Sequence, residues 1–379
     1  MPHMKRLFAA GLVAASTVFG ATTWAQAADQ EVNLYSYRQP FLIKPLLDAF
    51  TKETRIKVNV VFAKKGMLEK IKAAGDNSPA DAVLTVDIGR LYALKEGGVL
   101  QAVKSDTLEK NIPAHFRDPE GLWFGLTSRA RVALVSKERV KPGELTSYED
   151  LTDPKFKGRI CVRSGKNAYN VALIASMIAH HGEEGAEKWL QGVKANLARK
   201  PQGNDRAQAK AVYEGVCDIA ITNNYYMGKM MTNDEKPEQK KWAAAVRLTY
   251  LNQGDRGNHM NVSGAAVTKS AKNKEAAVKL LEFLSGDAAQ KIYAEDNQEY
   301  PVKPGVPYSK LVQSWGDFKA DTLSLEKIAK LRPAASRLVD KVGFDDGPGS
   351  WFVQKRISCR LPTGGQGWIR RRTRQLIRF

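Results

Sequence analysis

Short runs of apolar and β-branched residues alternate with stretches of helical periodicity along most of this chain, and this alternation restricts its fold more than any other feature. Residues 32–36 and 58–63 have the length and composition of strands, and the stretches after them repeat apolar residues at helical spacing. Residues 82–86 are apolar or β-branched throughout, as in a parallel strand buried on both faces. The pattern predicts an α/β protein, and 379 residues are enough for two domains with sizeable cores.

The same pattern continues to about residue 295. Further strands are expected at 132–136, 158–162, 219–222, 246–251 and 265–268, and helices at 42–52, 67–74, 90–96, 171–181, 184–198, 207–214 and 274–295. The last segment is expected to be one long helix, because Ala277, Leu280 and Leu284 fall on a single face.

The first 27 residues have the features of a processing segment. Lys5 and Arg6 precede an apolar run at 7–20, and residues 25–27 read Ala-Gln-Ala, a typical cleavage site. The run is shorter than the roughly 20 residues that span a bilayer, which favours a cleavable signal peptide (1–27) over a membrane anchor. We therefore expect the mature chain to be exported.

The formal charge of +19 is unevenly distributed. Residues 347–379 hold eight basic residues and no acidic one, and the signal peptide adds two more. A basic tail can bind nucleic acid or anionic lipid, but the abrupt change in composition after Asp346 is also what a shifted reading frame would give. The body has interspersed charges, as on an ordinary solvated surface, so no nucleic-acid partner is predicted and no function is based on the tail.

The chain contains three cysteines, of which Cys161 and Cys217 lie in the body and Cys359 lies in the tail. In an oxidising exported compartment the first two could form a disulfide, which would leave Cys359 unpaired.

Three tyrosines carry the most specific chemistry. Tyr225 and Tyr226 are adjacent and follow a predicted strand, and Tyr169 lies at the predicted start of a helix. Phenolates are hard donors that suit a hard, highly charged cation such as Fe(III), although a phenol with a pKa near 10 ligates at neutral pH only if the cation displaces its proton. Three phenolates would neutralise Fe(III) and occupy three of six positions, which leaves the others for a small bidentate anion, for water or for a further side chain. Arg129 and Arg131 are the candidates to hold that anion.

The loop before Tyr169 is a second candidate for anion binding. Ser164, Gly165 and Asn167 stand at a loop–helix junction, where backbone N–H groups point outward and attract anions.

Other interpretations of these residues stay open at this stage. Neighbouring tyrosines on an extended segment face opposite ways and often serve only in packing, and the tyrosines could instead be the walls of a site for an organic or inorganic anion. His180 and His181 do not share a helix face and are interpreted as a solvated helix end. His259 is interpreted as a hydrogen-bonding residue that orders its loop, in preference to a metal ligand. No nucleophile elbow, P-loop, dinucleotide motif, Cys-x-x-Cys or His-Glu-x-x-His occurs, so no enzyme is predicted.

Seven segments, in order along the chain, resemble the periplasmic ferric-ion-binding proteins of ABC transporters. They are Leu-Tyr-Ser-Tyr-Arg-Gln-Pro (34–40), Ser-Pro-Ala-Asp-Ala-Val-Leu-Thr-Val-Asp (78–87), Trp-Phe-Gly-Leu-Thr-Ser-Arg-Ala-Arg (123–131), Arg-Ser-Gly-Lys-Asn-Ala-Tyr-Asn (163–170), Asn-Tyr-Tyr-Met-Gly-Lys (224–229), Asn-His-Met-Asn-Val-Ser-Gly (258–264) and Asn-Gln-Glu-Tyr-Pro-Val (297–302). The resemblance covers roughly residues 31–346.

The resemblance implies a fold of two α/β lobes, each a mixed sheet flanked by helices, joined by two β-strand crossovers. The lobes would comprise 31–127 with 252–303, and 128–251 with 304–346. Fe(III) would lie in the cleft between them, and the monomeric protein would deliver it to an inner-membrane permease and its ATPase.

The resemblance also implies the ligands. Tyr169, Tyr225 and Tyr226 match the family's tyrosine ligands. Arg129 best matches the arginine that holds a synergistic carbonate or bicarbonate, and Arg131 is the second match. Many relatives supply a His-Tyr or Glu ligand from the first loop, where this chain has Gln39 and Pro40. It therefore resembles the subgroup with three tyrosines and an anion, and Tyr37 and Gln39 are the remaining candidates for a first-loop contact.

Overall fold

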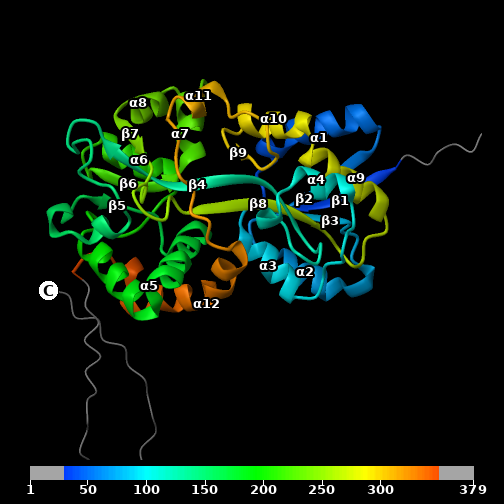
Figure 1. Ribbon diagram of the computed structural model, residues 1–379, viewed down its shortest axis with the longest axis horizontal. Coiled ribbons are helices and arrows are strands. Elements are labelled where there is room, and N and C mark those ends of the chain that lie inside the picture. The colour runs from blue at the N-terminus through cyan, green and yellow to red at the C-terminus, as the bar shows by residue number, and fades with distance from the viewer. Residues whose placement is uncertain (1–29, 350–379) are drawn as a thin grey trace, which may run out of the picture.

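Two long strands cross the middle of the molecule and join two α/β lobes (Figure 1). The computed structural model of the chain describes residues 30–349. The predicted signal peptide (1–27) and the tail from residue 350, with Cys359, lie outside the described residues.

The strands are β1 (Glu31–Ser36), β2 (Lys57–Phe62), β3 (Ala82–Thr85), β4 (Phe124–Ser136), β5 (Ile160–Cys161), β6 (Ile219–Asn223), β7 (Val246–Thr249), β8 (Met260–Val267) and β9 (Tyr300–Pro301). The α-helices are α1 (Pro40–Thr54), α2 (Met67–Ala74), α3 (Ile88–Glu96), α4 (Asp106–Asn111), α5 (Ala168–Ala195), α6 (Asp205–Tyr213), α7 (Asn224–Met231), α8 (Glu238–Ala244), α9 (Lys274–Ser285), α10 (Asp287–Glu295), α11 (Lys310–Gln313) and α12 (Leu325–Val342).

The strand order is β2-β1-β3-β8-β4-β6-β5, with β7 and β9 also paired to β4. β1 is parallel to β2 and β3, and β5 is parallel to β6, whereas β8 is antiparallel to β3 and β4. The sheet in each lobe is therefore mixed, and the α/β fold class predicted from the alternating pattern is confirmed.

β4 changes partners at the boundary between the lobes. Up to Ala130 it pairs with β8, and from Arg131 onward it pairs with β6 and then β7. All of its residues are buried. One continuous strand thus belongs to both sheets, and β8 beside it forms the second crossover, as the resemblance implied.

We propose that the second crossover begins at β8. The backbone N–H of Asn252 donates to the Thr146 carbonyl at 2.7 Å, and its side-chain oxygen accepts from the Tyr148 N–H at 3.0 Å. The loop that leads to β8 is therefore attached to the second lobe.

One hydrophobic core continues from lobe to lobe. It includes Leu91 of α3, Ile174 of α5 and Ile328 of α12, and α12 packs against both α3 and α5 (Figure 1). Two further clusters lie mainly in one lobe each, the first beneath α1 and α9 and the second beneath α6 and α7, where Tyr300 of β9 joins it. Helix α12 is therefore a third link between the lobes.

Most predicted elements are confirmed, but the single helix predicted at 274–295 is wrong. Gly286 has extended backbone angles (φ −79°, ψ 166°) and separates α9 from α10. Leu284 before the break and Ala289 after it are both buried, so the apolar pattern continues across a chain that is not helical. The two helices predicted at 171–181 and 184–198 are α5, which is interrupted at Gly182, where φ is 71°.

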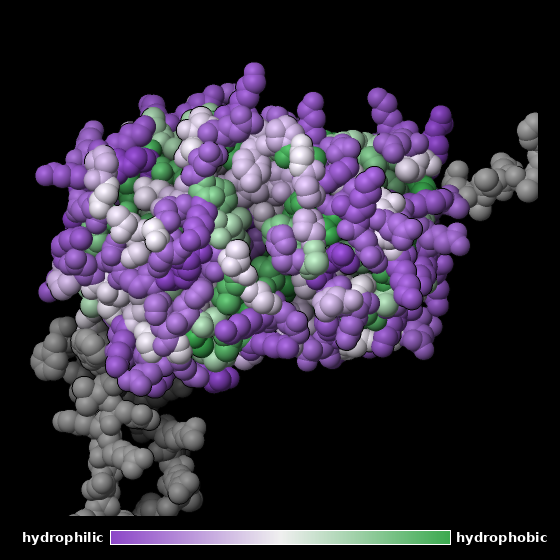
Figure 2. Space-filling view, in the orientation of Figure 1, coloured by the Kyte–Doolittle hydropathy of each residue, from purple (hydrophilic) through white to green (hydrophobic). Residues whose placement is uncertain are grey.

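The face shown in Figure 2 is mainly hydrophilic, with small hydrophobic areas. Within residues 30–349, every helix is too short or too polar to cross a bilayer.

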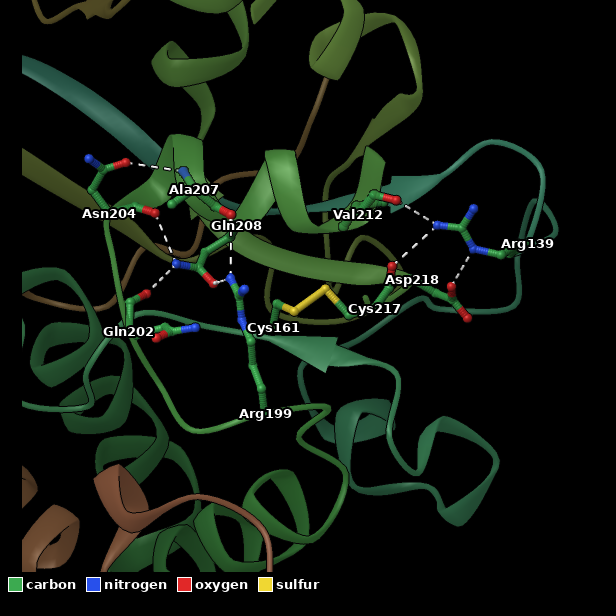
Figure 3. The surroundings of a disulfide bond; sticks show 10 residues. All are labelled: Arg139, Cys161, Arg199, Gln202, Asn204, Ala207, Gln208, Val212, Cys217 and Asp218. Atoms are coloured by element: carbon green, nitrogen blue, oxygen red, sulfur yellow. Dashed lines mark hydrogen bonds and ion pairs between the residues drawn. A yellow bond between two sulfur atoms is a disulfide. The ribbon is translucent and has the colours of Figure 1, made fainter. Parts of the chain in front are cut away.

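A disulfide joins Cys161 at the end of β5 to Cys217 shortly before β6 (Figure 3). Their Cα atoms are 5.9 Å apart, within the usual range of roughly 4.4–6.8 Å. Close by, Arg139 donates to the Val212 carbonyl at 2.7 Å and forms an ion pair with Asp218. The pairing considered from the cysteine content is confirmed.

Replacing both Cys161 and Cys217 with alanine should lower the free energy of unfolding by about 4 kcal/mol in the chain-entropy model, because the disulfide constrains a loop with a sequence separation of 56. Urea unfolding under oxidising conditions measures the loss. Reductant should destabilise the wild type and leave the double variant unchanged. A variant as stable as the oxidised wild type would contradict this assignment of stability.

His259 is buried at the crossover, directly before β8. Its carbonyl accepts from the Arg131 N–H at 3.0 Å, and within residues 30–349 neither ring nitrogen has a hydrogen-bond partner. Burial lowers the pKa of His259 to about 3, and the charges of Arg131, His180, Arg256 and Arg332 act in the same direction. The ring is therefore neutral in the folded protein at neutral pH. The predicted hydrogen-bonding role of the His259 side chain is wrong, because only the backbone of this residue forms hydrogen bonds among the described residues.

His259 should make stability depend on pH. Between its folded pKa of about 3 and the ordinary value of 6.5, the unfolded chain binds a proton that the folded chain does not. Its contribution to stability is therefore complete above 6.5 and is lost as pH falls toward 3. His259→Gln should flatten urea-unfolding stability against pH in this window by up to about 1.4 kcal/mol per pH unit. An unchanged slope would show that His259 does not carry this dependence.

Candidate functional site

The three tyrosines singled out from the sequence lie together in the structure. Tyr169 is in the first turn of α5, and Tyr225 and Tyr226 are in the first turn of α7. The hydroxyl oxygens of Tyr225 and Tyr169 are 3.4 Å apart, and the ring centroids of Tyr225 and Tyr226 are 4.4 Å apart. The adjacent pair begins a helix instead of continuing a strand, so its two rings lie beside each other.

An asparagine stands at the cap position of each of the two helices. Asn167 caps α5, and its side-chain oxygen accepts the Tyr169 N–H at 3.1 Å. Asn223 stands at the cap position of α7, and its side-chain amide donates to the Tyr225 hydroxyl at 3.5 Å. Asn224 attaches the same helix to the crossover, because its side-chain oxygen accepts the Ala130 N–H at 3.0 Å.

The phenols are difficult to ionise without a cation. Burial raises the pKa of Tyr225 well above 10, and the neighbouring Tyr169 and Tyr226 raise it further. Burial also raises the pKa of Tyr226, with contributions from Tyr169 and Asp205. At neutral pH these two phenols are therefore protonated in the metal-free protein, and a bound trivalent cation would have to displace their protons.

Four arginines surround the phenols. The guanidinium carbons of Arg129, Arg131 and Arg163 lie 5.9, 5.8 and 5.5 Å from the Tyr169 ring centroid, and that of Arg206 lies 5.5 Å from the Tyr226 ring centroid. Sequence reasoning missed Arg163 and Arg206, although Arg163 lies within a segment that carried the resemblance. The region is rich in positive charge and suits an anion as well as phenolates.

Arg129 and Arg131 point to the same side of β4, as alternate residues of a strand do, but their partners differ. Arg131 pairs with Asp205 and also donates to the side-chain oxygens of Asn223 at 3.0 Å and Asn170 at 2.7 Å. All of these bonds lie within the second lobe. They engage the Arg131 guanidinium with protein groups, so it is less available to a bound anion than the guanidinium of Arg129.

Arg129 instead contacts the crossover and the first lobe. Its guanidinium donates to the Ser263 hydroxyl at 2.8 Å and to the Val262 carbonyl at 3.0 Å, and it lies 3.9 Å from Glu299. Arg38 donates to the same Ser263 hydroxyl at 2.9 Å and pairs with Glu299. Arg38 is therefore the first-loop side chain beside Arg129.

The two first-loop candidates lie elsewhere. The Tyr37 hydroxyl accepts the Met67 N–H at 3.1 Å, and its ring lies 4.3 Å from the Arg90 guanidinium carbon. Gln39 is exposed at the start of α1. Across residues 30–349, no hydrogen bond joins Tyr37 or Gln39 to the three tyrosines.

The loop before Tyr169 already holds a carboxylate of the chain itself. Asp345 accepts the Gly165 N–H at 2.7 Å and the Ser164 hydroxyl at 2.6 Å. The sequence suggested that this junction attracts anions, and the occupant in the structure is the Asp345 side chain.

Histidine, cysteine and carboxylate side chains do not form an alternative metal centre. Among the described residues, no group of three or more of them could hold a metal ion. His180 bonds to Asp321 at 2.8 Å and His181 to Glu149 at 2.6 Å. The tyrosine cluster is therefore the best metal-binding candidate in this part of the chain.

Two lobes joined by strand crossovers, with a polar and aromatic cluster at the crossover, define a solute-binding protein. The chain matches the family of bacterial extracellular solute-binding proteins over residues 77–316, and it belongs to this family. That family consists of solute-binding proteins and not of enzymes, in agreement with the absence of catalytic motifs.

Three relatives show which members of this family the chain is similar to. Iron uptake protein A1 of Synechocystis sp. is 47% identical to this chain, over 83% of this chain and 88% of that protein. The apo ferric ion-binding protein A of Pasteurella haemolytica is 53% identical, with a TM-score of 0.81, over 84% of this chain and 99% of the other. A Trichodesmium protein in complex with iron and citrate is 46% identical, with a TM-score of 0.78, over 83% and 99% of the two chains.

Asp205→Asn should strongly destabilise the protein, because Arg131 and Arg163 both pair with this buried carboxylate. Breaking a buried ion pair from one side typically costs about 3–5 kcal/mol. Urea unfolding measures the effect. Asp234→Asn is the matched control, since Asp234 forms an ion pair with Lys240 at an exposed position. Equal stability of the two variants would contradict the structural role of Asp205.

Proposed function

We propose that this chain is the periplasmic binding protein of an ABC importer for Fe(III), and that Tyr169, Tyr225 and Tyr226 are its iron ligands. The observation that carries the proposal is the convergence of three phenols from two helix N-termini. Hard oxygen donors of this kind suit a hard trivalent cation. The names of the relatives, an iron uptake protein and a ferric ion-binding protein, support the same cargo.

The charge of the site supports binding of the iron together with an anion. Three phenolates balance Fe(III), so they would leave the positive charge of the surrounding guanidinium groups uncompensated except by Asp205 and Glu299. Arg129 is the favoured anion contact because Arg131 is committed to Asp205 and Arg38 to Glu299, whereas Arg129 lies 3.9 Å from the Glu299 carboxylate and has no closer acidic partner among the described residues. Carbonate or bicarbonate would complete the coordination. A carboxylate anion is the competitor, since the Trichodesmium structure contains iron and citrate.

The fold suggests how iron would be enclosed and transferred. With the boundary at the start of β8, the first lobe (31–127 with 260–303) and the second (128–259 with 304–346) would close around the site by bending at β4 and β8. The closed monomer would then present iron to a membrane permease and its ATPase. Export by the signal peptide at 1–27 places the protein in the periplasm, and the tail has no part in this function.

The test is a visible absorption titration of the mature protein with a ferric chelate. A tyrosinate-to-iron charge-transfer band should appear and saturate at one equivalent. Tyr226→Phe removes one ligand oxygen and keeps the ring, so it should abolish the band while the protein stays folded. Tyr213→Phe, at an exposed position on α6, should leave it unchanged. Normal iron binding by Tyr226→Phe would end the three-phenolate assignment.

The same titration separates the alternatives. A band that forms with bicarbonate and not in its absence identifies the synergistic anion, whereas formation with citrate alone favours a carboxylate. A colourless protein would turn the search to organic or inorganic anions. Truncation after Asp346 should leave iron binding unchanged, and loss of binding would give the tail a role.

A further inference from the structure

Arg332 lies in the middle of α12, the helix that packs against both lobes. One terminal nitrogen donates to the Ala168 carbonyl at 2.9 Å, and the other lies 3.7 Å from a carboxylate oxygen of Asp87. Ala168 belongs to α5 in the second lobe, and Asp87 precedes α3 in the first. One guanidinium group therefore contacts both lobes.

The contact on the first lobe is closely packed. A Cβ atom added to Gly89 would lie 1.9 Å from Arg332 Nε and 2.4 Å from its Cδ. Gly89 lies in the first turn of α3 and its φ is not positive, so the backbone conformation does not require glycine at this position. The absence of a side chain at residue 89 thus leaves the space that the Arg332 side chain occupies.

Asp87 is attached to the crossover as well as to α3. It is fully buried and caps α3 by accepting the Arg90 N–H at 3.1 Å. Its neighbour Ile88 donates its N–H to the side-chain oxygen of Asn261 on β8 at 3.1 Å. Within residues 30–349 the second carboxylate oxygen of Asp87 has no hydrogen-bond partner. The start of α3 is therefore held by the same strand that connects the lobes.

The contact on the second lobe is adjacent to the proposed iron site. Ala168 directly precedes Tyr169, and both residues belong to the first turn of α5. A guanidinium that holds the Ala168 carbonyl also holds the backbone from which the Tyr169 phenol projects. A fixed carbonyl in this turn restricts rotation of the helix start.

We propose that Arg332 is a positioning residue that couples the place of Tyr169 to the arrangement of the lobes. It does not touch the iron. Arg332 contacts Asp87 in the first lobe and Ala168 in the second, so a movement of one lobe relative to the other must alter at least one of these contacts. A change in the contact with Ala168 would also move Tyr169, the next residue in the chain. The inference rests on the proposed function, in which Tyr169 is a ligand.

This coupling gives a specific expectation for iron release. Without the Arg332 guanidinium, Tyr169 should be held less firmly and should dissociate from the iron more readily. If Arg332 were only a structural residue, its removal would lower stability without changing the ligands of the iron. The two cases differ in the absorption spectrum of the loaded protein, which reports on tyrosinate ligation.

The experiment compares Arg332→Ala, Gly89→Ala and the double variant with the wild type, all as full-length mature protein loaded with Fe(III). Transfer of iron to a competing chelator gives the release rate, and the charge-transfer band gives the ligation. Arg332→Ala should release iron about tenfold faster, a coupling of ordinary size for linked sites. Its band should change toward that of Tyr169→Phe. Arg337→Ala, at an exposed position on the same helix, should match the wild type.

Gly89→Ala should resemble Arg332→Ala, because the added methyl group displaces the arginine side chain. In the double variant the two effects should not add, since the group that clashes has been removed. Should Arg332→Ala fail to fold, Arg332→Lys replaces it. Lysine keeps the charge beside Asp87 but lacks the two-pronged guanidinium, so release should still be faster.

The possible results distinguish failure of this inference from failure of the proposed function. A coloured wild type with Arg332 variants that keep its release rate and band overturns this inference and leaves the proposed function intact. Additive effects of Gly89→Ala and Arg332→Ala also overturn it, because Gly89 would then act independently. A wild type without a charge-transfer band overturns the proposed function and this inference together.

Discussion

The buried carboxylate of Asp205 is the interaction on which the candidate site depends. It pairs with Arg131 on the crossover strand β4 and with Arg163 in the loop before α5, and it accepts the Asn223 N–H at 3.1 Å where α7 begins. Burial alone would raise the pKa of Asp205, but Arg131 and Arg163 lower it, so the group stays ionised. One charge thus links the three segments that place the tyrosines.

The second constraint is charge balance. In the metal-free protein Tyr225 and Tyr226 are neutral, because burial and mutual proximity raise the pKa of both. If all three phenols lose their protons when Fe(III) binds, three protons leave the site and one ion with three positive charges enters it. The net charge of the buried site therefore does not change. This exchange explains how a site poor in carboxylates can hold a trivalent cation. The nearby arginines then favour an additional anion and disfavour a second metal ion.

The sequence predicted what depends on local pattern. The bounds of α2 and the position of β3 follow directly from short, self-contained apolar runs. The break at Gly286 was missed because α9 and α10 bury the same side against one core. β4 was predicted only from residue 132, because its earlier part carries the charged Arg129. A charged residue is not expected in a buried strand unless its partners are known. The partners of Arg129, Ser263 and Glu299, are distant in sequence.

The same limit applies to the site. Tyr169, Tyr225 and Tyr226 could be selected from residue chemistry and resemblance, since each lies in a distinctive segment. The resemblance ranked Arg129 ahead of Arg131 as the anion contact, but the physical reason for that order could not be predicted, because it depends on Asp205 and Ser263, which the sequence does not place. Nothing in the sequence pattern around Arg332 indicated a role for this residue. Its importance appears only when α12 is seen to reach both Asp87 and Ala168.

The most direct test of the central claim is to count the phenolates that form when iron binds. Tyrosinate absorbs in the ultraviolet differently from tyrosine, so a difference spectrum between the loaded and the metal-free mature protein at neutral pH reports the number ionised per iron. The account predicts three tyrosinates for each Fe(III) bound. A stoichiometric iron complex with one tyrosinate or none would contradict it and would require a different set of ligands.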